Sequence, residues 1–186
     1  MELERLKEEA FETAKAHGWH DEELPDETCL MLIITEIAEA VQADRKEKRA
    51  NVNAYMEYVA AWATYTMDGN HGNAFELYLK GSVEEELADV VIRCLDMAGK
   101  TGCDLSNVKT LLDRGMNKVK ETFPEFMYRM CQLLTDEMDT LRGRLNYCIA
   151  CIIGYSRQNG IDIEWFIRRK MEYNKTRSYR HGGKRY

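Results

Sequence analysis

Residues that break helices and patterns that build strands are nearly absent from this sequence. It has two prolines, Pro25 and Pro124, in 186 residues, and stretches in which apolar and polar residues alternate are hard to find. Since alternation with a period of two marks a half-buried strand, the sequence predicts an all-α protein. The longest apolar runs, 30–34 and 148–154, fall far short of the ~20 residues that cross a bilayer. No membrane partner is therefore expected.

The sequence also shows neither a signal-peptide pattern nor a strongly basic composition. Its first residues, MELERLKEE, are acidic and have no apolar core, which predicts a cytoplasmic protein. The net charge of −6 argues against a general nucleic-acid binder, so we expect no nucleic-acid partner. With 186 residues and a hydrophobic fraction of 45%, a single folded domain over 1–186 is the simplest organisation.

Cysteines and histidines are few and form no disulfide or metal pattern. The six cysteines are scattered, and Cys148 and Cys151, which form a C-x-x-C, lie in an apolar helical stretch. Packed, reduced thiols are a better interpretation there than a zinc or redox site. The four histidines lie outside the two acidic helices described below, which argues against a di-metal redox bundle built on Glu-x-x-His.

Apolar residues at helical spacing, separated by Gly, Pro, Asn and Asp, predict a bundle of helices. We expect helices at 2–17, 26–48, 52–67, 74–80, 82–98, 105–122, 124–136, 137–158 and 162–176, and a polar tail at 177–186. The glycines Gly99 and Gly102 are expected to break the fifth of these helices, and Asp104 is expected to cap the sixth.

The helix at 82–98 combines a core-facing stripe with an acidic one. Ser82 is a good N-cap, and Glu85 three residues later completes a capping box. We interpret Glu84 and Glu85 as capping and solvent-facing residues. At about 100° per residue, a charged stripe runs beside the apolar face and contains Glu86, Asp89, Arg93 and Asp96. An ionised carboxylate beside a core resists desolvation unless it is paired or holds a metal.

A second helix, at 26–48, shows the same combination. It is apolar on nearly all sides between 30 and 43, as expected of a buried helix, yet it contains Glu36 and Glu39. Glu36-x-x-Glu39 and Glu86-x-x-Asp89 each place two carboxylates about one turn apart on a helix face. We predict that the two pairs face each other and share divalent cations.

Carboxylate ligands without a histidine suit Mg²⁺, or alternatively Mn²⁺, because both ions prefer hard oxygen ligands. Mg²⁺ also binds phosphate oxygens of substrates, so such a site can align a polyphosphate and activate a water. Spacing and burial alone favour a metal role and buried ion pairs with Arg93 or Arg45 about equally.

The C-terminal end is basic although the chain as a whole is acidic. From 168 to 186, Lys and Arg occur eight times against one acid, Glu172. Such a cluster favours a local anion, for example a phosphate group. A solvated tail is the alternative.

Three stretches, taken in order, carry a resemblance to a known family. They are TEIAEAVQADRK at 35–46, VEEELADVVIRCLD at 83–96 and KMEYNKTRSYRHGGK at 170–184, preceded by HGW at 17–19. With E-x-x-E, E-x-x-D and K-x-x-x-N-x-x-R in this order, the sequence resembles the MazG-like superfamily of all-α nucleoside triphosphate pyrophosphohydrolases. The resemblance implies hydrolysis of a (deoxy)nucleoside triphosphate between its α and β phosphates, which gives the monophosphate and pyrophosphate. It also implies a bundle with a four-helix metal-binding core.

The same resemblance implies roles for individual residues. Mg²⁺ would be bound by Glu36, Glu39, Glu86 and Asp89, and either Glu36 or Glu39 would help to deprotonate the attacking water. The substrate phosphates would be held by Lys170 and Asn174, with Arg177 and Lys184 contributing from the tail. Trp19 would border or stack on the base, the alternative being an ordinary core or interface tryptophan.

Two residues of the acidic helix are expected to support the metal ligands. Arg93 follows Asp89 by one turn, so we expect it to pair with Asp89 or to orient it. Asp96 lies two turns from Asp89, so we expect it to support the metal-binding side chains without binding the metal itself, or to face solvent.

One segment, 103–160, separates the acidic helix from the Lys170 helix, and short members of the family have no such insertion. It can complete the bundle within one chain or build an oligomer surface, and we expect a homo-oligomer, either a dimer or a tetramer.

The competing function is a non-catalytic helical binding protein. In that case the acidic pairs would be structural and the basic tail would bind an anion.

Overall fold

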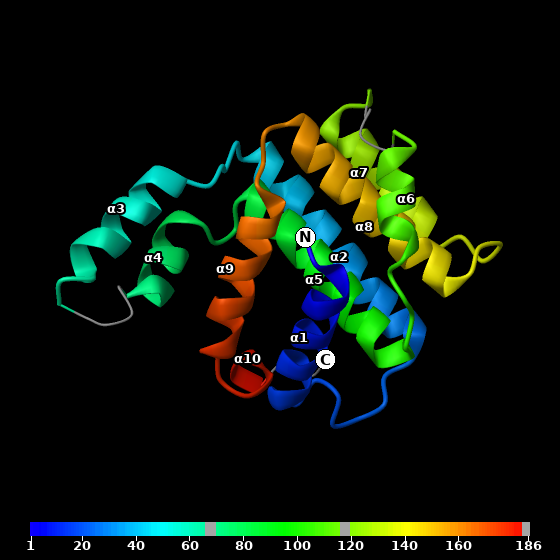
Figure 1. The fold of residues 1–186 in the computed structure, drawn as a ribbon, viewed down its shortest axis with the longest axis horizontal. Coiled ribbons are helices and arrows are strands. Elements are labelled where there is room, and N and C mark those ends of the chain that lie inside the picture. Colours follow the sequence, from blue (N-terminus) through cyan, green and yellow to red (C-terminus); the bar gives the residue numbers. More distant parts are fainter. Residues whose placement is uncertain (66–69, 116–119, 184–186) are drawn as a thin grey trace.

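The chain folds into helices, as the sequence predicts. A computed structural model describes residues 1–65, 70–115 and 120–183, and these residues contain no strand (Figure 1). The helices are α1 (Leu3–Ala16), α2 (Asp26–Arg45), α3 (Val52–Trp62), α4 (His71–Tyr78), α5 (Val83–Thr101), α6 (Asn107–Asp113), α7 (Phe123–Leu134), α8 (Leu141–Gln158), α9 (Ile163–Lys175) and α10 (Arg180–Gly183). Within these ranges, no helix is both long and apolar enough to cross a membrane.

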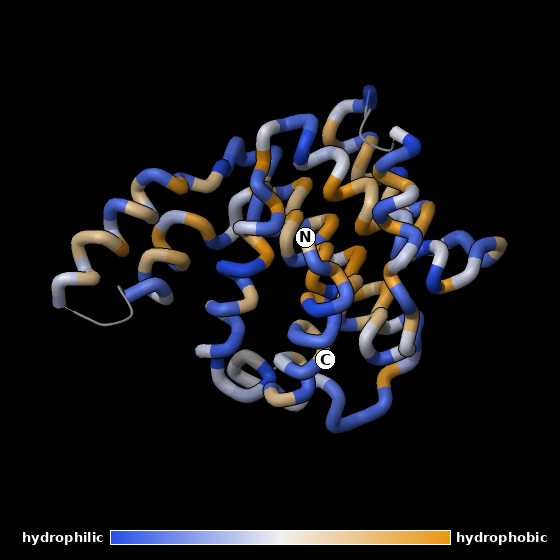
Figure 2. Tube along the Cα trace, in the orientation of Figure 1, coloured by the Kyte–Doolittle hydropathy of each residue, from blue (hydrophilic) through white to orange (hydrophobic). Residues whose placement is uncertain are grey.

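Helix α5 is the centre of the bundle. It packs against α1, α2, α8 and α9, and Figure 1 shows it running among these helices. Its apolar face is fully buried, with Val83, Leu87, Val90, Val91 and Cys94 at 0% exposure. Figure 2 shows apolar residues gathered where these helices meet. The amphipathic pattern at 82–98 therefore marks the main core element.

Helix α5 begins where predicted but ends later. Ser82 caps it, because its Oγ accepts a hydrogen bond from the Glu85 backbone N–H at 3.2 Å. The expected break at Gly99 is wrong, since the helix continues to Thr101 and ends at Gly102, which adopts φ +68°. Gly99 instead allows α1 to approach closely. A Cβ atom placed there would lie 2.6 Å from the Cβ of Phe11.

Gly99→Ala is expected to destabilise the protein even though alanine is the better helix former. The added methyl would clash with Phe11, and separating α1 from α5 should cost about 1–3 kcal/mol. The matched control is Gly72→Ala in α4, where an added Cβ meets nothing within 4 Å. There, higher helix propensity should stabilise by up to about 1 kcal/mol. Chemical denaturation of both variants measures the contrast, and equal shifts would contradict the close contact.

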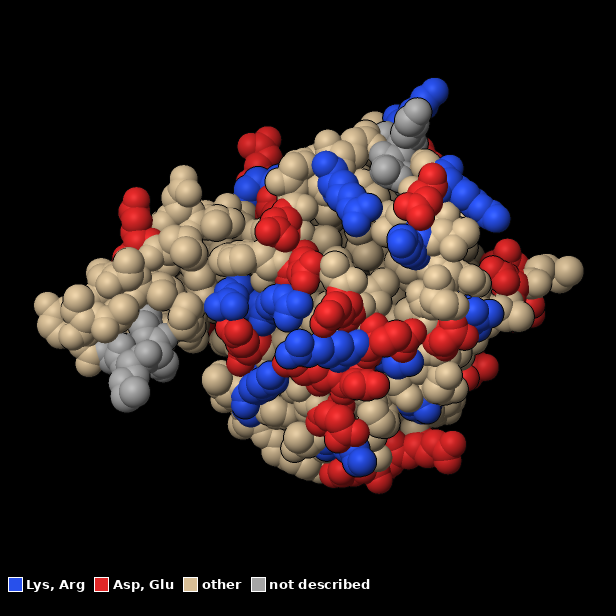
Figure 3. All heavy atoms as spheres, in the orientation of Figure 1, with Lys and Arg blue, Asp and Glu red and all other residues tan. Residues whose placement is uncertain are grey.

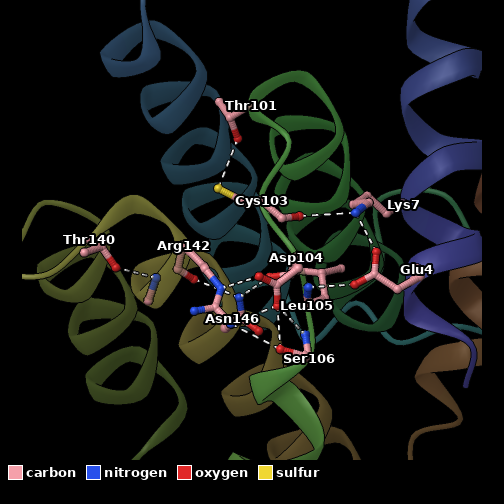
Figure 4. Close-up of polar contacts among 11 residues, drawn as sticks. Glu4, Lys7, Thr101, Cys103, Asp104, Leu105, Ser106, Thr140, Arg142 and Asn146 are labelled. Carbon is pink, nitrogen blue, oxygen red and sulfur yellow. Dashed lines mark hydrogen bonds and ion pairs between the residues drawn. The ribbon is translucent and has the colours of Figure 1, made fainter.

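The segment 103–160 is part of the bundle. Helices α7 and α8 pack against α2 and α5, and α6 packs against α8. Figure 4 shows the junction: Arg142 Nε lies 2.7 Å from Asp104 Oδ2, and the Asn146 side chain donates to the Asp104 carbonyl oxygen at 2.9 Å. Of the two roles considered for the insertion, completing the bundle within one chain is the one that these contacts favour.

Helices α3 and α6 are shortened most relative to the sequence prediction, and α8 begins at Leu141 rather than at 137. Helix α6 ends at Asp113 rather than at 122, because the chain turns at Gly115, which adopts φ +92°. Asp104 does not cap a helix beginning at 105. It instead accepts a hydrogen bond from the Ser106 N–H, ahead of α6. Helix α3 ends at Trp62 rather than at 67, and 66–69 and 116–119 lie outside the described residues.

Helices α3 and α4 form an arm that projects from the bundle (Figure 1). They pack against each other, and α4 also packs against α9. Tyr55 is buried, whereas Trp62 and Tyr65 further along the arm are exposed. The end of α4 and the turn that follows it lie beside the start of α5, where they contribute to the cleft described next.

Candidate functional site

One cleft collects the residues that the sequence singles out. Its volume is about 480 Å³, and residues of α1, α2, α4, α5 and α9 line it. The lining includes all the predicted site residues that the structure describes: Trp19, Glu36, Glu39, Glu86, Asp89, Arg93, Asp96, Lys170, Asn174 and Arg177. Lys184 lies outside the described residues. The fold thus brings together three motifs that lie far apart in the sequence.

Three of the four predicted metal ligands form a tight cluster. Glu36, Glu86 and Asp89 each offer a carboxylate oxygen, and these oxygens lie within 4.8 Å of one another. Their positions follow from the packing of α2 against α5, which buries the neighbouring Ile37 and Leu87. Glu39, one turn further along α2, is exposed and lines the cleft outside this cluster.

Full ionisation of the three carboxylates is unfavourable in the metal-free cluster. The pKa of Glu86 is raised to about 9, mainly by burial and then by the carboxylates of Glu85, Asp89 and Glu39. Burial and Asp89 also raise the pKa of Glu36, against the opposing effect of Arg93. A divalent cation would relieve this repulsion, so the oxygen donors and their charge fit Mg²⁺ or Mn²⁺.

Glu86→Gln is expected to make the metal-free protein more stable at alkaline pH. The folded-state pKa of about 9 exceeds the usual 4.5, so the wild-type protein loses stability as pH rises between these values. Glutamine has no such proton to lose, and its advantage should reach about 1–3 kcal/mol near pH 9. Thermal unfolding in EDTA at about pH 6 and about pH 9 measures this effect. The same difference in Tm at both pH values would contradict it.

Arg93 pairs with Glu36 and not with Asp89, contrary to the sequence-based expectation. Its Nε donates to Glu36 Oε1 at 3.0 Å, which links α5 to α2. Its guanidinium also lies 5.9 Å from the ring centre of Trp19. Asp89 is occupied by a different cation, Lys170. Arg93 therefore orients a cluster carboxylate, but it does so across the helix–helix contact.

Two other charged residues of the sequence prediction have partners outside the cluster. Asp96 Oδ1 lies 2.7 Å from His20 Nε2, which ties α5 to the turn after α1. This contact favours the supporting role for Asp96. Arg45, considered as an ion-pair partner of the acidic residues, instead donates to Gln42 at 3.4 Å.

Lys170 is buried between two acidic residues of α5. Its ammonium contacts Glu85 and lies 2.5 Å from Asp89 Oδ2. The prediction that Glu85 faces solvent is wrong, since Glu85 is 1% exposed. The i, i+4 spacing of Glu85 and Asp89 is the sequence signal that could have identified this pair of partners. Only the fold decides which helix supplies the cation.

The side of the cleft near α9 offers further polar and cationic groups. Asn174 Oδ1 is buried and has no hydrogen-bond partner among the described residues, so it can accept a hydrogen bond from a bound ligand. Arg177 lies against the Tyr173 ring, at 5.8 Å from its centre. The sequence-based prediction missed Lys48 and Lys80, which also line the cleft.

Figure 3 shows mixed acidic and basic side chains over the middle of this face of the molecule, whereas the arm is almost uncharged.

The cysteines remain separate from this site. None of the six, all of which lie in the described ranges, forms a disulfide, and Cys148 and Cys151 are buried in α8. Burial is the main cause that raises the pKa of Cys151 to about 11, as expected of an unreactive packed thiol. The structure therefore agrees with packed, reduced thiols at the C-x-x-C.

Comparison of the chain with known protein families, with curated proteins and with solved structures gives no match.

Proposed function

We propose that this protein is a Mg²⁺-dependent nucleoside triphosphate pyrophosphohydrolase of the MazG-like kind. One observation carries the proposal: three carboxylate oxygens within 4.8 Å of one another share a cleft with Lys170, Asn174 and Arg177. An acidic cluster beside cationic and amide groups suits a metal–polyphosphate substrate. The four-helix core of this site would consist of α1, α2, α5 and α9.

The proposed roles divide the cleft into three parts. Glu36, Glu86 and Asp89 would hold Mg²⁺, and Glu39 would join them from the rim. When bound, Mg²⁺ neutralises phosphate oxygens and aids the activation of a water. Glu39 is the better candidate to accept the proton of the attacking water, because Glu36 is already paired with Arg93.

The phosphates and the base would occupy different walls. Lys170, Asn174 and Arg177 would hold the phosphates from α9 and the segment that follows it. The apolar part of the lining, which includes Trp19, Leu32 and Ile92, would border the base. The position of the Arg93 guanidinium over Trp19 stabilises the indole on this wall.

A non-catalytic binding protein is the second candidate, and one observation favours it. Glu36 and Asp89 each already have a cationic side-chain partner, as structural ion pairs would. The two candidates differ in what Mg²⁺ would do. An enzyme turns over a nucleotide only with the ion, whereas a binding protein of this kind binds its anion without turnover.

A panel of ribo- and deoxynucleoside triphosphates, assayed with Mg²⁺ and separately with Mn²⁺, tests the proposal through the identity of the products. We expect a nucleoside monophosphate and pyrophosphate. Release of orthophosphate, or no turnover of any nucleotide by the folded protein, would contradict the proposed reaction. Omission of the metal is the matched control and should abolish turnover.

We further propose that the protein is a cytoplasmic homo-oligomer, a dimer or a tetramer. Exposed apolar side chains gather on the arm, where Met56, Trp62, Tyr65 and Leu77 all face solvent in the single chain. Multi-angle light scattering of the purified protein measures the mass in solution. A monomer at micromolar concentration would contradict the oligomer.

A further inference from the structure

Glu85 is an acidic residue of the cleft that belongs neither to the proposed metal ligands nor to the proposed phosphate-binding residues. Its carboxylate is buried and held in place. Oε2 accepts a hydrogen bond from the Gly81 N–H at 2.7 Å, and Oε1 contacts the Lys170 ammonium. Gly81 adopts φ +70°, which L side chains rarely adopt, so the turn before α5 presents this N–H from a defined position.

The Lys170 ammonium is confined between Glu85 and Asp89. The two carboxylates are four residues apart on α5 and are therefore neighbours on one helix face. The ammonium also lies 5.6 Å from the centre of the Phe75 ring, and Lys170 is only 7% exposed. It cannot move to solvent without breaking both ion pairs. Against the lowering effect of burial, Asp89 and Glu85 raise the pKa of Lys170 above its usual value.

Asp89 serves two purposes at once. Its Oδ2 lies 2.5 Å from the ammonium, and the same side chain offers an oxygen to the cluster with Glu36 and Glu86. A divalent cation in the cluster and the ammonium would both depend on the single negative charge of Asp89, and they would repel each other. Glu85 supplies a second negative charge to the ammonium without being one of the cluster carboxylates.

We propose that Glu85 is a positioning residue that neutralises Lys170, so that Asp89 remains available to a divalent cation. The inference rests on the proposed metal site. With Glu85 present, the ammonium and the cation can occupy the cleft together and act on the same phosphates. Without it, the ammonium pairs with Asp89 alone and competes with the cation.

Binding of Mn²⁺ alone, measured by electron paramagnetic resonance titration without nucleotide, tests this inference. Glu85→Gln retains the side-chain shape and an oxygen for the Gly81 N–H but removes the charge. It should weaken Mn²⁺ binding by about 10- to 100-fold. Glu85→Gln combined with Lys170→Met also removes the competing ammonium. The double variant should bind Mn²⁺ within about threefold of the wild-type protein.

The matched control is Glu84→Gln, which removes the adjacent charge outside the cleft and should leave Mn²⁺ affinity within about twofold. A double variant as weak as Glu85→Gln would mean that Glu85 acts directly on the cation, and would overturn the inference. So would a double variant that binds about tenfold more tightly than the wild-type protein, because the intact pair would then be the competitor. If Glu85→Gln alone does not fold, as judged by circular dichroism, the comparison of the double variant with the wild-type protein still tests the inference.

Two outcomes separate this inference from the proposed function. If the wild-type protein binds no Mn²⁺, the proposed metal site fails and the inference fails with it. If the wild-type protein binds Mn²⁺ and Glu85→Gln binds it equally well, only the inference is overturned.

Discussion

Asp89→Asn is expected to lower kcat/KM for the preferred nucleoside triphosphate by about 10³-fold, which corresponds to about 4 kcal/mol of transition-state stabilisation. Asp89 is the residue on which the two halves of the cleft depend, because it contributes an oxygen to the acidic cluster and contacts Lys170 at 2.5 Å. Asparagine keeps the shape but withdraws the charge from both cations. Steady-state kinetics with Mg²⁺ over a range of substrate concentrations measures the loss.

Glu84→Gln is the matched control for this substitution. Glu84 lies on the same helix and accepts a hydrogen bond from the Ala50 N–H at 2.9 Å, but it does not line the cleft. Its kcat/KM should stay within about threefold of the wild-type value. A folded Asp89→Asn protein with near wild-type activity would remove Asp89 from the metal site.

Lys170→Met is expected to lower the free energy of unfolding by about 3–5 kcal/mol, because it leaves two buried carboxylates without their cation. Glu85 is 1% exposed and the Asp89 side chain 14% exposed, so water cannot fully replace the ammonium. The double variant with Glu85→Gln should recover part of this loss, because only the Asp89 carboxylate then remains without its cation. Urea denaturation in EDTA measures both values without a contribution from bound metal.

Lys175→Met, five residues further along α9, is the control for the loss of a lysine from this helix. Lys175 Nζ lies 2.6 Å from Glu9 Oε1, but its side chain is 48% exposed. Loss of such a surface ion pair should cost less than about 1 kcal/mol. Equal destabilisation by the two lysine substitutions would show that burial of the Lys170 pairs contributes nothing particular to stability.

The prediction of an all-α fold succeeded because it relied on local information. Helical spacing of apolar residues, the Ser82 cap and the scarcity of proline are all properties of short stretches, and α5 begins as they indicate. Gly99 shows where local information is insufficient. A glycine within a helix can mark its end or a close contact, and the distance to Phe11 decides between these readings.

The sequence by itself determined which residues are candidates for the site. The spacing of Glu36, Glu39, Glu86 and Asp89 along two apolar helices fixes which carboxylates share a helix face, because an α-helix repeats about every 3.6 residues wherever it forms. The motif order places Lys170 and Asn174 after them. All of these residues line one cleft.

Only the tertiary structure decided which of these groups meet. Glu85 faces Lys170, Arg93 reaches Glu36, and Glu39 stays at the rim. These outcomes depend on how α2 and α9 are rotated and placed against α5, and hence on the packing of the whole core. Spacing along one helix holds no information about that rotation, so the partner of each buried charge could not be deduced from the sequence.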